Sequence, residues 1–581
     1  MPITPPADQP TTVKITRISA GGVAPRAFYP ALAVIVVSVV VTAAFPDEVG
    51  RRMASIQSTI VNSFNWYYVL AVAGFVVFAV WMGLSRFGDI KLGPDDARPD
   101  YSLTTWFAML FGAGMGIGLV FWGAAEPLSH LTSPRPGTTG DDVELAQTAM
   151  AQTFLHWGVH AWAIYVVVGL ALAYAVHRKG RPLSIRWALE PLLGDRVRGW
   201  PGDLVDGVAI VGTVFGVATS LGLGVKQISA GLVHLGVIDQ PSNGVLVLLI
   251  AAITLIAMAS VVSGVSRGIK WLANINIVLA IVFMVVVLVV GPTLFLLREF
   301  VESFGAYLQN LVPLTFDLGA YRGDAGVAWQ GAWTTFYWGW WISWAPFVGG
   351  FIAKISRGRT IREFVGGVLV VPAAVAFLWF AVMGGTAIHD QLLGDGGLVE
   401  AGGEIVSENV LFEMVADLPG GTVLSVLALL LVVIFSTTPL AASSLVAGTL
   451  SSGGDPEPSR WTRVLFAALI GLAAVALLLT ARDGSGLIAL RTAAIAFALP
   501  FSLVMVALCV ASYRAVRAEH QLLLSAQRRQ QREEFHRHVA GQLSENFDDT
   551  FGSKIDSRID RALAGIDAAT EAATDERRAD G

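Results

Sequence analysis

The chain has 581 residues, of which 54% are hydrophobic and only 14% are charged, and its formal net charge is −5. Soluble chains carry nearer a quarter charged residues, so this composition excludes an ordinary soluble protein and predicts a membrane protein. The single cysteine, Cys509, excludes a framework of disulfides within the chain.

Segments free of Asp, Glu, Lys and Arg predict about twelve transmembrane helices, called spans 1 to 12 below. Each is long enough to cross a bilayer, which takes about 20 apolar residues. The first 28 residues lack the apolar core of a cleavable signal and are expected to form a cytoplasmic tail. The predicted spans are 29–46, 62–85, 102–124, 150–176, 207–225, 243–266, 271–297, 325–353, 364–388, 418–454, 464–481 and 492–513.

The charges of the loops predict the orientation of the spans. The loop between spans 9 and 10 is acidic and contains no Lys or Arg, whereas the loops after spans 4 and 8 and the start of the C-terminal tail are basic. Because basic loops stay in the cytoplasm, both termini are expected there. The basic residues are Arg178, Lys179, Arg181, Arg186, Arg196, Arg198, Lys354, Arg357, Arg359, Arg362, Arg514 and Arg517.

Span 3 contains a run of alternating glycines from Gly112 to Gly118. Each glycine lowers helix preference by about 1 kcal/mol relative to Ala. Close packing of small residues between helices is one explanation of this run. Alternating glycines place bare positions on opposite sides of a helix, however, which favours local unwinding. Unwound backbone inside a membrane lines a cavity and offers its N–H and C=O groups as ligands.

The span count also suggests an internal repeat. Spans 3–7 and 8–12 are two sets of five, and an odd number makes the second set run opposite to the first. Transporters built from such inverted repeats bind substrate at the midplane between them. The predicted parts are a tail (1–28), two peripheral helices (29–100), a first repeat (101–300), a connecting segment (301–324) that an interfacial helix could form, a second repeat (325–515) and a cytoplasmic tail (516–581).

Two spans carry dense aromatic clusters. Trp157, Trp162 and Tyr165 share one sector of span 4, and five tryptophans lie within residues 333–344 of span 8, among them Trp341 and Trp344. An interfacial aromatic belt would sit at span ends, whereas these residues lie well inside. Ordinary core packing remains the alternative.

An aromatic cluster with no carboxylate nearby in the sequence suits a trimethylammonium group. Such a group has no N–H donor, and the faces of Trp and Tyr attract it by about 0.5–2 kcal/mol each. A carboxylate on the same ligand could bind the freed amides of Gly114–Gly118. The residues therefore favour a box that binds a quaternary-ammonium cation, with plain core packing as the alternative.

Four segments resemble the betaine/choline/carnitine transporters, and most of all bacterial sodium-coupled glycine betaine transporters. They are GMGIGLVFWGAAEP (114–127), FLHWGVHAWAIY (154–165), TVFGVATSLGLG (213–224) and FYWGWWISWAPFVGGFIAKISRGRTIREF (336–364). The similarity covers roughly residues 55–515. It implies an all-α membrane protein with twelve spans, an inverted repeat in spans 3–12, and a homotrimer in the cytoplasmic membrane of a bacterium.

The resemblance also implies roles for individual positions. A glycine at Gly118 favours a zwitterion, since choline-type members tend to carry Asp there. The implied substrate-binding residues are Trp157, Trp162, Tyr165, Trp341, Trp344, Phe336, Gly114, Met115, Gly116 and Gly118.

Sodium, the coupling ion that the family implies, prefers hard oxygen ligands. The implied ligands are the carbonyls of Gly112, Met115 and Phe435, the hydroxyl of Thr438, and a second set with Thr213 and Phe347. This chain departs from the pattern at Pro439, which replaces a serine, and at Val217, which replaces a threonine. Proline lacks an N–H and can free an upstream carbonyl, which offsets part of that loss.

Three further groups of polar residues stand in or near the spans. Lys226 closes an uncharged run, where it either reaches water at the outer end of span 5 or acts as a charge surrogate for sodium. His156 and His160 could bind a metal or relay a proton, but without a third ligand nearby they are expected to be packed and hydrogen-bonded. Glu126 is expected to be a structural contact at the outer mouth.

The C-terminal tail is basic over 514–538, which favours contact with anionic lipid of the cytoplasmic leaflet. Beyond it, 541–581 carries apolar residues at helical spacing, which predicts an amphipathic helix that docks on a partner surface. In the resembling transporters a basic C-terminal helix senses osmotic stress, so regulation by this tail is a hypothesis.

The sequence therefore predicts a secondary transporter that imports glycine betaine or a similar compatible solute by sodium-coupled alternating access. We expect no enzyme activity and no cofactor, with Na⁺ as the coupling ion. No catalytic constellation or nucleic-acid-binding motif was found. The alternatives are a sodium-independent or proton-coupled carrier or exchanger of choline, carnitine, ectoine or proline, and a channel, which would need a continuous polar pore.

Overall fold

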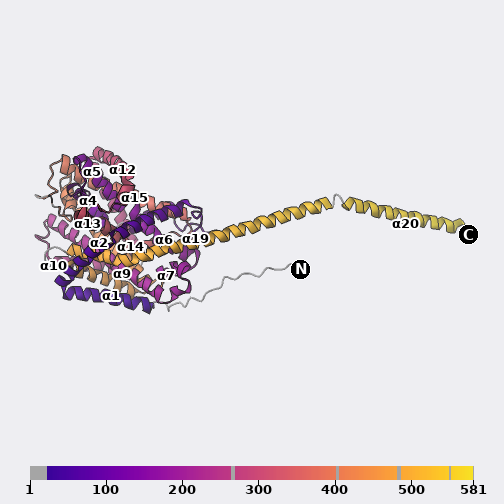
Figure 1. Cartoon of the computed structure of the whole chain (residues 1–581), viewed down its shortest axis with the longest axis horizontal. Coiled ribbons are helices and arrows are strands. Elements are labelled where there is room, and N and C mark those ends of the chain that lie inside the picture. The colour runs from indigo at the N-terminus through magenta and orange to yellow at the C-terminus, as the bar shows by residue number, and fades with distance from the viewer. Residues whose placement is uncertain are drawn as a thin grey trace. The chain divides into compact units, whose positions relative to one another are not determined.

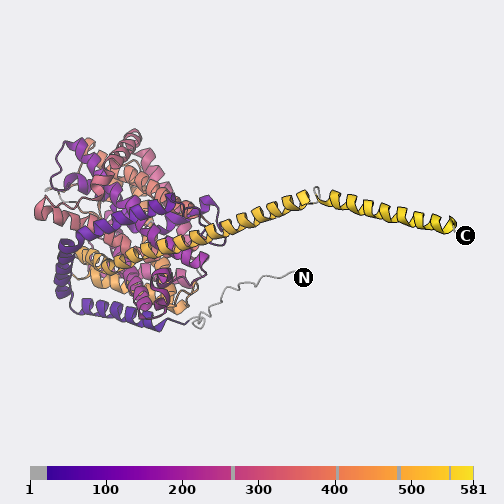
Figure 2. The ribbon, with the colours of Figure 1, turned by 45° about the vertical axis from the view of Figure 1, so that its right-hand side comes forward.

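The computed structural model describes residues 22–114, 116–263, 268–400, 403, 405–480, 486–547 and 551–579. In these residues the chain forms helices and one isolated β-bridge, between Lys91 and Thr360. The chain divides into two compact units, Met1–Arg514 and Ala515–Gly581. The helical bundle of the first unit appears in Figures 1 and 2.

The helices of the first half are α1 (Pro25–Ala44), α2 (Pro46–Leu84), α3 (Leu103–Gly114), α4 (Ile117–Thr132), α5 (Asp142–Trp157), α6 (Val159–Ala173), the π-helix η1 (Tyr174–Arg178), α7 (Ile185–Ala188), α8 (Glu190–Leu193), the 3₁₀ helix η2 (Gly194–Arg198), α9 (Trp200–His234), α10 (Asn243–Val262), α11 (Gly268–Val290) and α12 (Thr293–Thr315). Those of the second half are α13 (Gly323–Ala332), α14 (Thr334–Ile355), α15 (Ile361–Leu393), α16 (Val410–Ala416), α17 (Gly421–Ser451), α18 (Arg460–Leu478), α19 (Gly486–Phe547) and α20 (Ser553–Ala579).

The all-helical membrane fold is confirmed. By length and hydropathy, the described residues contain nine helices that could cross a membrane, or eleven when two sharply bent pairs each count as one span. Within the described residues each predicted span overlaps a helix, and the eighth overlaps α13 and α14. Helix α14 has 22 residues, but its many Trp, Tyr and Thr side chains lower its hydropathy. The count of twelve stays a prediction.

The predicted break in span 3 is confirmed. Helix α3 ends at Gly114 and α4 begins at Ile117, and the two segments are bent by 71°. Met115 lies outside the described residues. A second break, which the sequence did not predict, separates α5 from α6 at Gly158. A Cβ at Gly158 would lie 2.5 Å from the carbonyl oxygen of Phe154, so only glycine fits this backbone.

The central helices of the two predicted repeats pack on one another reciprocally: a contact made by a helix of one repeat has a counterpart made by the equivalent helix of the other. Helix α14, in span 8, packs on α6 of span 4, and α4, in span 3, packs on α15 of span 9. Helices α9 and α17, the third of each set, pack on each other. Residues 209–225 of α9 and 334–350 of α14 are buried throughout, which places these helices in the core.

The peripheral helices expose apolar side chains, as lipid-facing helices do. Val37 and Val40 of α1 are more than half exposed, and α1 lies along the edge of the bundle in both views (Figures 1 and 2). Helix α12, which is bent by 111° from α11, buries Leu296 and Tyr307 but exposes Val301 on its other side. It begins at Thr293, so the predicted domain boundary at residue 300 falls inside this amphipathic helix.

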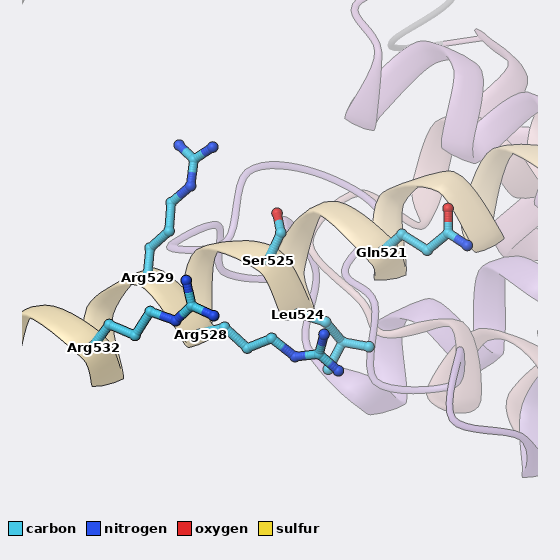
Figure 3. A pocket seen from close by; sticks show the side chains of 6 residues that line it. All are labelled: Gln521, Leu524, Ser525, Arg528, Arg529 and Arg532. Atoms are coloured by element: carbon cyan, nitrogen blue, oxygen red, sulfur yellow. The ribbon is translucent and has the colours of Figure 1, made fainter.

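The second unit contains the end of α19 and all of α20. Figure 3 shows Arg528, Arg529 and Arg532 projecting from one stretch of α19, within the basic segment expected from the sequence. Most described side chains of this unit are exposed, including Ile555 and Ile559 of α20.

Candidate substrate site

Three helices bring the predicted cage residues together. Trp157 ends α5, Trp162 and Tyr165 lie on α6, and Trp341 lies on α14; each is at most 4% exposed. The ring centroids are 4.9 Å apart for Trp157 and Trp341, 5.5 Å for Trp162 and Tyr165, and 6.3 Å for Tyr165 and Trp341. We call these four residues the aromatic box.

A stack of rings on α14 leads away from the box. Phe336 stacks on Trp340 with centroids 5.4 Å apart, and Trp340 stacks on Trp341 at 4.9 Å. We call Phe336, Trp340 and Trp341 the aromatic column. Trp344 contacts Trp340 edge-on at 6.2 Å. The resemblance implied that Phe336 and Trp344 lie beside the box; both contact Trp340, which in turn stacks on Trp341 of the box.

Indole hydrogen bonds fix the orientation of these rings. Trp341 donates to the carbonyl of His156 at 2.9 Å, Trp344 to the carbonyl of Gly216 at 3.0 Å, and Trp340 to the hydroxyl of Ser220 at 3.0 Å. Each buried N–H is thereby satisfied, and each ring is held at one edge while its faces remain available for packing.

The glycines of the broken helix lie against the tryptophans. A Cβ at Gly114 would come within 2.0 Å of Trp162, one at Gly116 within 2.5 Å of Trp344, and one at Gly118 within 2.4 Å of Trp340 and 2.8 Å of Trp157. These separations are far below van der Waals contact. The glycine run therefore provides the space that the rings occupy, in addition to breaking the helix.

The start of α4 lies at this break. Gly116 precedes the helix in an extended conformation, with no side chain capping the first turn. The first N–H groups of a helix lack intrahelical partners and attract anions. The backbone amides expected near a substrate carboxylate are therefore at a helix N-terminus beside the box.

Glu126 was expected to be a structural contact at the outer mouth, and the structure shows it hydrogen-bonded to four side chains. Its buried carboxylate accepts a hydrogen bond from the Trp157 indole at 2.7 Å and one from the Tyr337 hydroxyl. Its other oxygen lies 2.7 Å from Nδ1 of His156 and 3.3 Å from Nε2 of His130. A carboxylate thus contacts a ring of the aromatic box, which the sequence did not predict.

The histidines are hydrogen-bonded as expected, but the expectation that no third ligand lies near them was wrong for His156. Ligand atoms of Glu126, His130 and His156 all lie within 4.8 Å of one another, close enough to hold a metal ion. His160 instead bonds to the Thr315 hydroxyl at 2.9 Å and stacks on Trp338. The spacing of Glu126 and His130 by one helical turn was the available signal.

The implied sodium ligands lie on helices that pack together. Gly112 is on α3, Thr213 on α9, and Phe347 on α14, which packs against both α3 and α9. Phe435 and Thr438 lie on α17, which packs on α4. Pro439 has no N–H to donate to the Phe435 carbonyl four residues earlier, so this carbonyl lacks its helical partner. Met115 is not among the described residues.

Lys226 forms an ion pair. Its ammonium lies 3.2 Å from the carboxylate of Glu408, in the acidic loop between α15 and α16, and both side chains are about one-fifth exposed. Helix α9 continues beyond Lys226 to His234, and both interpretations of this lysine stay predictions.

Arg491, on α19, was missing from the predicted site because the last span was begun at residue 492. Its guanidinium carbon lies 5.0 Å from the ring centroids of both Trp122 and Phe336. A charge at the very start of an apolar run was the signal in the sequence.

Comparisons with known proteins agree with this geometry. Residues 26–521 match the family model described as BCCT, betaine/carnitine/choline family transporter. An uncharacterized transporter of Mycobacterium tuberculosis is 52% identical over 494 residues, which are 84% of this chain and 82% of the relative. A glycine betaine transporter of Bacillus subtilis is 41% identical over 86% of this chain and 96% of its own length.

An ectoine/hydroxyectoine transporter of Virgibacillus pantothenticus is 40% identical over 84% of this chain and 95% of its own length. Among solved structures, a Na⁺-coupled sialic acid symporter matches with a TM-score of 0.38 and 13% identity, over 78% of this chain and 86% of that one. This last likeness is too low to locate an ion or a substrate. The family match over nearly the whole chain is decisive, and the protein belongs to the betaine/carnitine/choline family of transporters.

Proposed function

We propose that this transporter imports a zwitterionic compatible solute, glycine betaine or a close analogue, across the bacterial cytoplasmic membrane by sodium-coupled alternating access. The observation that carries the proposal is the buried aromatic box on α5, α6 and α14. The glycine betaine and ectoine transporters among the relatives support the same class of substrate.

The box suits the cationic end of such a solute. Trimethylammonium is held by ring faces rather than by hydrogen bonds, at about 0.5–2 kcal/mol for each face. Glu126 accepts the indole N–H of Trp157, so its negative charge lies at the edge of one of these rings and favours a cation nearby. The buried hydroxyl of Tyr165 has no hydrogen-bond partner among the described residues and can serve a polar group of the solute.

The rings contact one another in this conformation. With the centroids of Trp157 and Trp341 4.9 Å apart, a trimethylammonium group enters only when these two rings separate. Two helix breaks next to residues of the box, one between α3 and α4 and one at Gly158, supply the places where its walls can move. We propose that the box opens to one side of the membrane at a time, as alternating access requires.

Sodium coupling is supported by the oxygen atoms of α17. The Thr438 hydroxyl donates to the carbonyl of Ile434 at 2.9 Å, which leaves the lone pairs of its oxygen available to a cation. The Phe435 carbonyl, freed by Pro439, is a second hard ligand. Against these stands the hydroxyl that the chain lacks at Pro439.

Uptake measurements test substrate and ion together. Labelled glycine betaine is offered to bacterial cells that express this chain and have no betaine carrier of their own, with choline, carnitine, ectoine or proline as competitors. We expect saturable, concentrative uptake, competition by other zwitterions, and a large loss when potassium replaces sodium. Undiminished uptake in potassium would refute sodium coupling alone, whereas non-saturable flux would refute a carrier.

Changing Pro439 to serine tests the sodium site directly. The variant restores a hydroxyl beside Thr438, so we expect it to lower the sodium concentration needed for half-maximal uptake. Pro372→Ala, in α15, is the control for loss of a proline within a buried helix. An unchanged sodium dependence in Pro439→Ser would count against the proposed ligand set.

We further propose that both termini are cytoplasmic, that the basic stretch of α19 contacts anionic lipid, and that the protein is a homotrimer. The first two follow from the distribution of Lys and Arg, since each basic residue near an anionic leaflet contributes about 1 kcal/mol. The trimer follows from membership of the family.

A further inference from the structure

Arg491 is a charged residue inside the helical bundle. It lies near the start of α19, in a helix long and apolar enough to cross the membrane. Its guanidinium lies over two rings, those of Trp122 on α4 and Phe336 on α14, at 5.0 Å from each centroid. Ionisable residues at such positions are costly and usually serve function.

Two donors at this position lack acceptors. Nε of Arg491 and Nε1 of Trp122 are both buried and have no hydrogen-bond partner among the residues that the structure describes. Within the same residues, Arg491 forms no ion pair with any carboxylate. Arg491 as a whole is of intermediate exposure, but these two buried, unpaired N–H groups each carry a desolvation penalty, which an anionic acceptor would remove.

The two described carboxylates whose charges act on Arg491 are already engaged. The charge of Arg491 interacts with those of Glu408 and Glu126. Glu408 pairs with Lys226, and Glu126 receives the indole of Trp157 and the hydroxyl of Tyr337. Neither carboxylate contacts the guanidinium, so the available acceptor must come from outside this cluster.

The aromatic column connects Arg491 to the box. Arg491 covers Phe336, which stacks on Trp340, which in turn stacks on Trp341 of the box. The acidic loop that carries Glu408 is on the outer side in the proposed orientation. Arg491 therefore lies at the end of the column farther from Trp341, and its charge interacts with that of Glu408 in this loop.

We propose that Arg491 and Trp122 form an outer subsite for the carboxylate of the zwitterionic substrate. The planar guanidinium fork matches a carboxylate in two parallel hydrogen bonds, and the Trp122 indole adds a third donor. The trimethylammonium end then faces the column and the box, so the site binds both ends of a zwitterion. This inference rests on the proposed function and deepens it.

Paired ligands test the subsite. Glycine betaine and choline share the trimethylammonium group, but only glycine betaine carries a carboxylate. We would measure KM for labelled glycine betaine and Ki for choline in the same cells expressing wild type, Arg491→Gln, Arg491→Lys or Trp122→Phe. Because both constants come from one folded population, misfolding changes the maximal rate rather than their ratio. Arg463→Gln, on α18, is the control for loss of another partly buried arginine.

In Arg491→Gln we expect KM for glycine betaine to rise roughly ten- to hundredfold, the effect of one or two lost charge-assisted hydrogen bonds. Choline Ki should stay the same or fall, since a cation is no longer repelled. Arg491→Lys should recover part of the affinity, because it keeps the charge without the fork. Trp122→Phe should shift KM the same way by less, and Arg463→Gln should shift neither constant.

An Arg491→Gln variant with the wild-type KM, or with KM and Ki raised by the same factor, would overturn the subsite and leave the proposed function standing. If choline does not inhibit any variant, KM in Arg491→Gln compared with Arg463→Gln decides. A wild-type chain that takes up no zwitterion would refute the proposed function, and the inference with it.

Discussion

At the residue scale, the carboxylate of Glu126 organises one wall of the aromatic box. Trp157, Tyr337, His156 and His130 all contact its two oxygens. A carboxylate is the one side chain here that can accept bonds at both oxygens. The position of the Trp157 ring therefore depends on a residue that need not touch the substrate.

Glu126→Gln tests this dependence. An amide keeps one acceptor oxygen and replaces the other by a donor, so one pair of contacts becomes unfavourable. Each buried donor left unpaired costs about 1–3 kcal/mol, so we expect a lower melting temperature and a KM for glycine betaine raised at least severalfold. Thermal unfolding in detergent and uptake kinetics measure the two effects.

The matched control for that variant is Glu144→Gln, because Glu144 is an exposed residue in the first turn of α5. It should leave both the melting temperature and KM unchanged. Wild-type kinetics in Glu126→Gln would show that Trp157 does not need this carboxylate.

Gly118 illustrates a second residue-scale constraint. Its Cβ would lie 2.4 Å from Trp340, so Gly118→Ala must displace a ring of the column. Overpacking of this kind costs about 1–3 kcal/mol, more than the roughly 1 kcal/mol that alanine adds to helix preference. We expect uptake to fall, with a higher KM, in transport assays at equal expression.

Gly74→Ala is the control for this substitution, since no atom lies within 4 Å of the Cβ position at Gly74 on α2. That change should be neutral or stabilising. A Gly118→Ala transporter with normal affinity would mean that the rings relax at little cost. The charge argument for a zwitterion at Gly118 remains a separate prediction.

Trp157, Trp162 and Tyr165 could be named from the sequence because they stand close together in one aromatic segment, although the break at Gly158 places them on two helices. Glu126 and Arg491 could not, because their partners are distant in the chain: Tyr337 lies 211 residues from Glu126. Hydrophobic periodicity carries no information about such contacts. The requirement that a span contain no charged residue likewise excluded Arg491, which stands one position before the last predicted span.

At the element scale, the glycine run predicted the α3–α4 break, whereas the break at Gly158 was missed. A lone glycine lowers helix preference by about 1 kcal/mol, too little to predict an interruption in an apolar span. The deciding contact is tertiary, since a Cβ at Gly158 would also lie 2.6 Å from the Phe377 ring of α15. Helix α14 is a different case: it is buried, but its aromatic residues keep its mean hydropathy too low to identify it as a span.

The loops outside the bundle are joined by ion pairs around Asp317, which follows α12. This carboxylate pairs with Arg135, from the segment after α4, and with Arg322 at 2.8 Å. Burial would raise the pKa of Asp317, but the hydrogen bonds from Arg322 and Gly319 and the two positive charges outweigh it and hold this pKa below its usual value. Asp317 therefore stabilises the folded state when it is ionised.

Because the folded-state pKa is depressed, the stabilisation is fully present above the unfolded pKa, near 4, and disappears as pH falls through the folded pKa. Asp317→Asn should thus lower stability by about 1–3 kcal/mol at pH 7, and the difference from wild type should shrink below about pH 4. Thermal unfolding from pH 3 to 7 measures this. The exposed Asp324→Asn is the control, and a difference that grows in acid would contradict the sign.

At the scale of the whole molecule, the chain divides into a transport unit, Met1–Arg514, and a C-terminal unit, Ala515–Gly581. The sequence predicts a C-terminal tail that begins at residue 516, because apolar spans end there and a basic and then amphipathic stretch begins; this domain assignment stays a prediction. The function of the second unit was left as a hypothesis, since its apolar residues do not say what they contact.

Helix α20 presents Ile555, Ile559, Leu563 and Ile566 on one side, each about half exposed. Exposed apolar area costs about 25 cal/mol per Å², so this face gains from docking. If docking regulates transport, removing residues 541–581 should leave KM for glycine betaine unchanged in isotonic medium but alter the rise in uptake after hyperosmotic shock. The double variant Ile559→Asp/Leu563→Asp keeps the length and removes the apolar face, and should act like the deletion. If both respond to shock as wild type does, α20 has no regulatory role; if only the deletion changes the response, the length or charge of the tail matters and its apolar face does not.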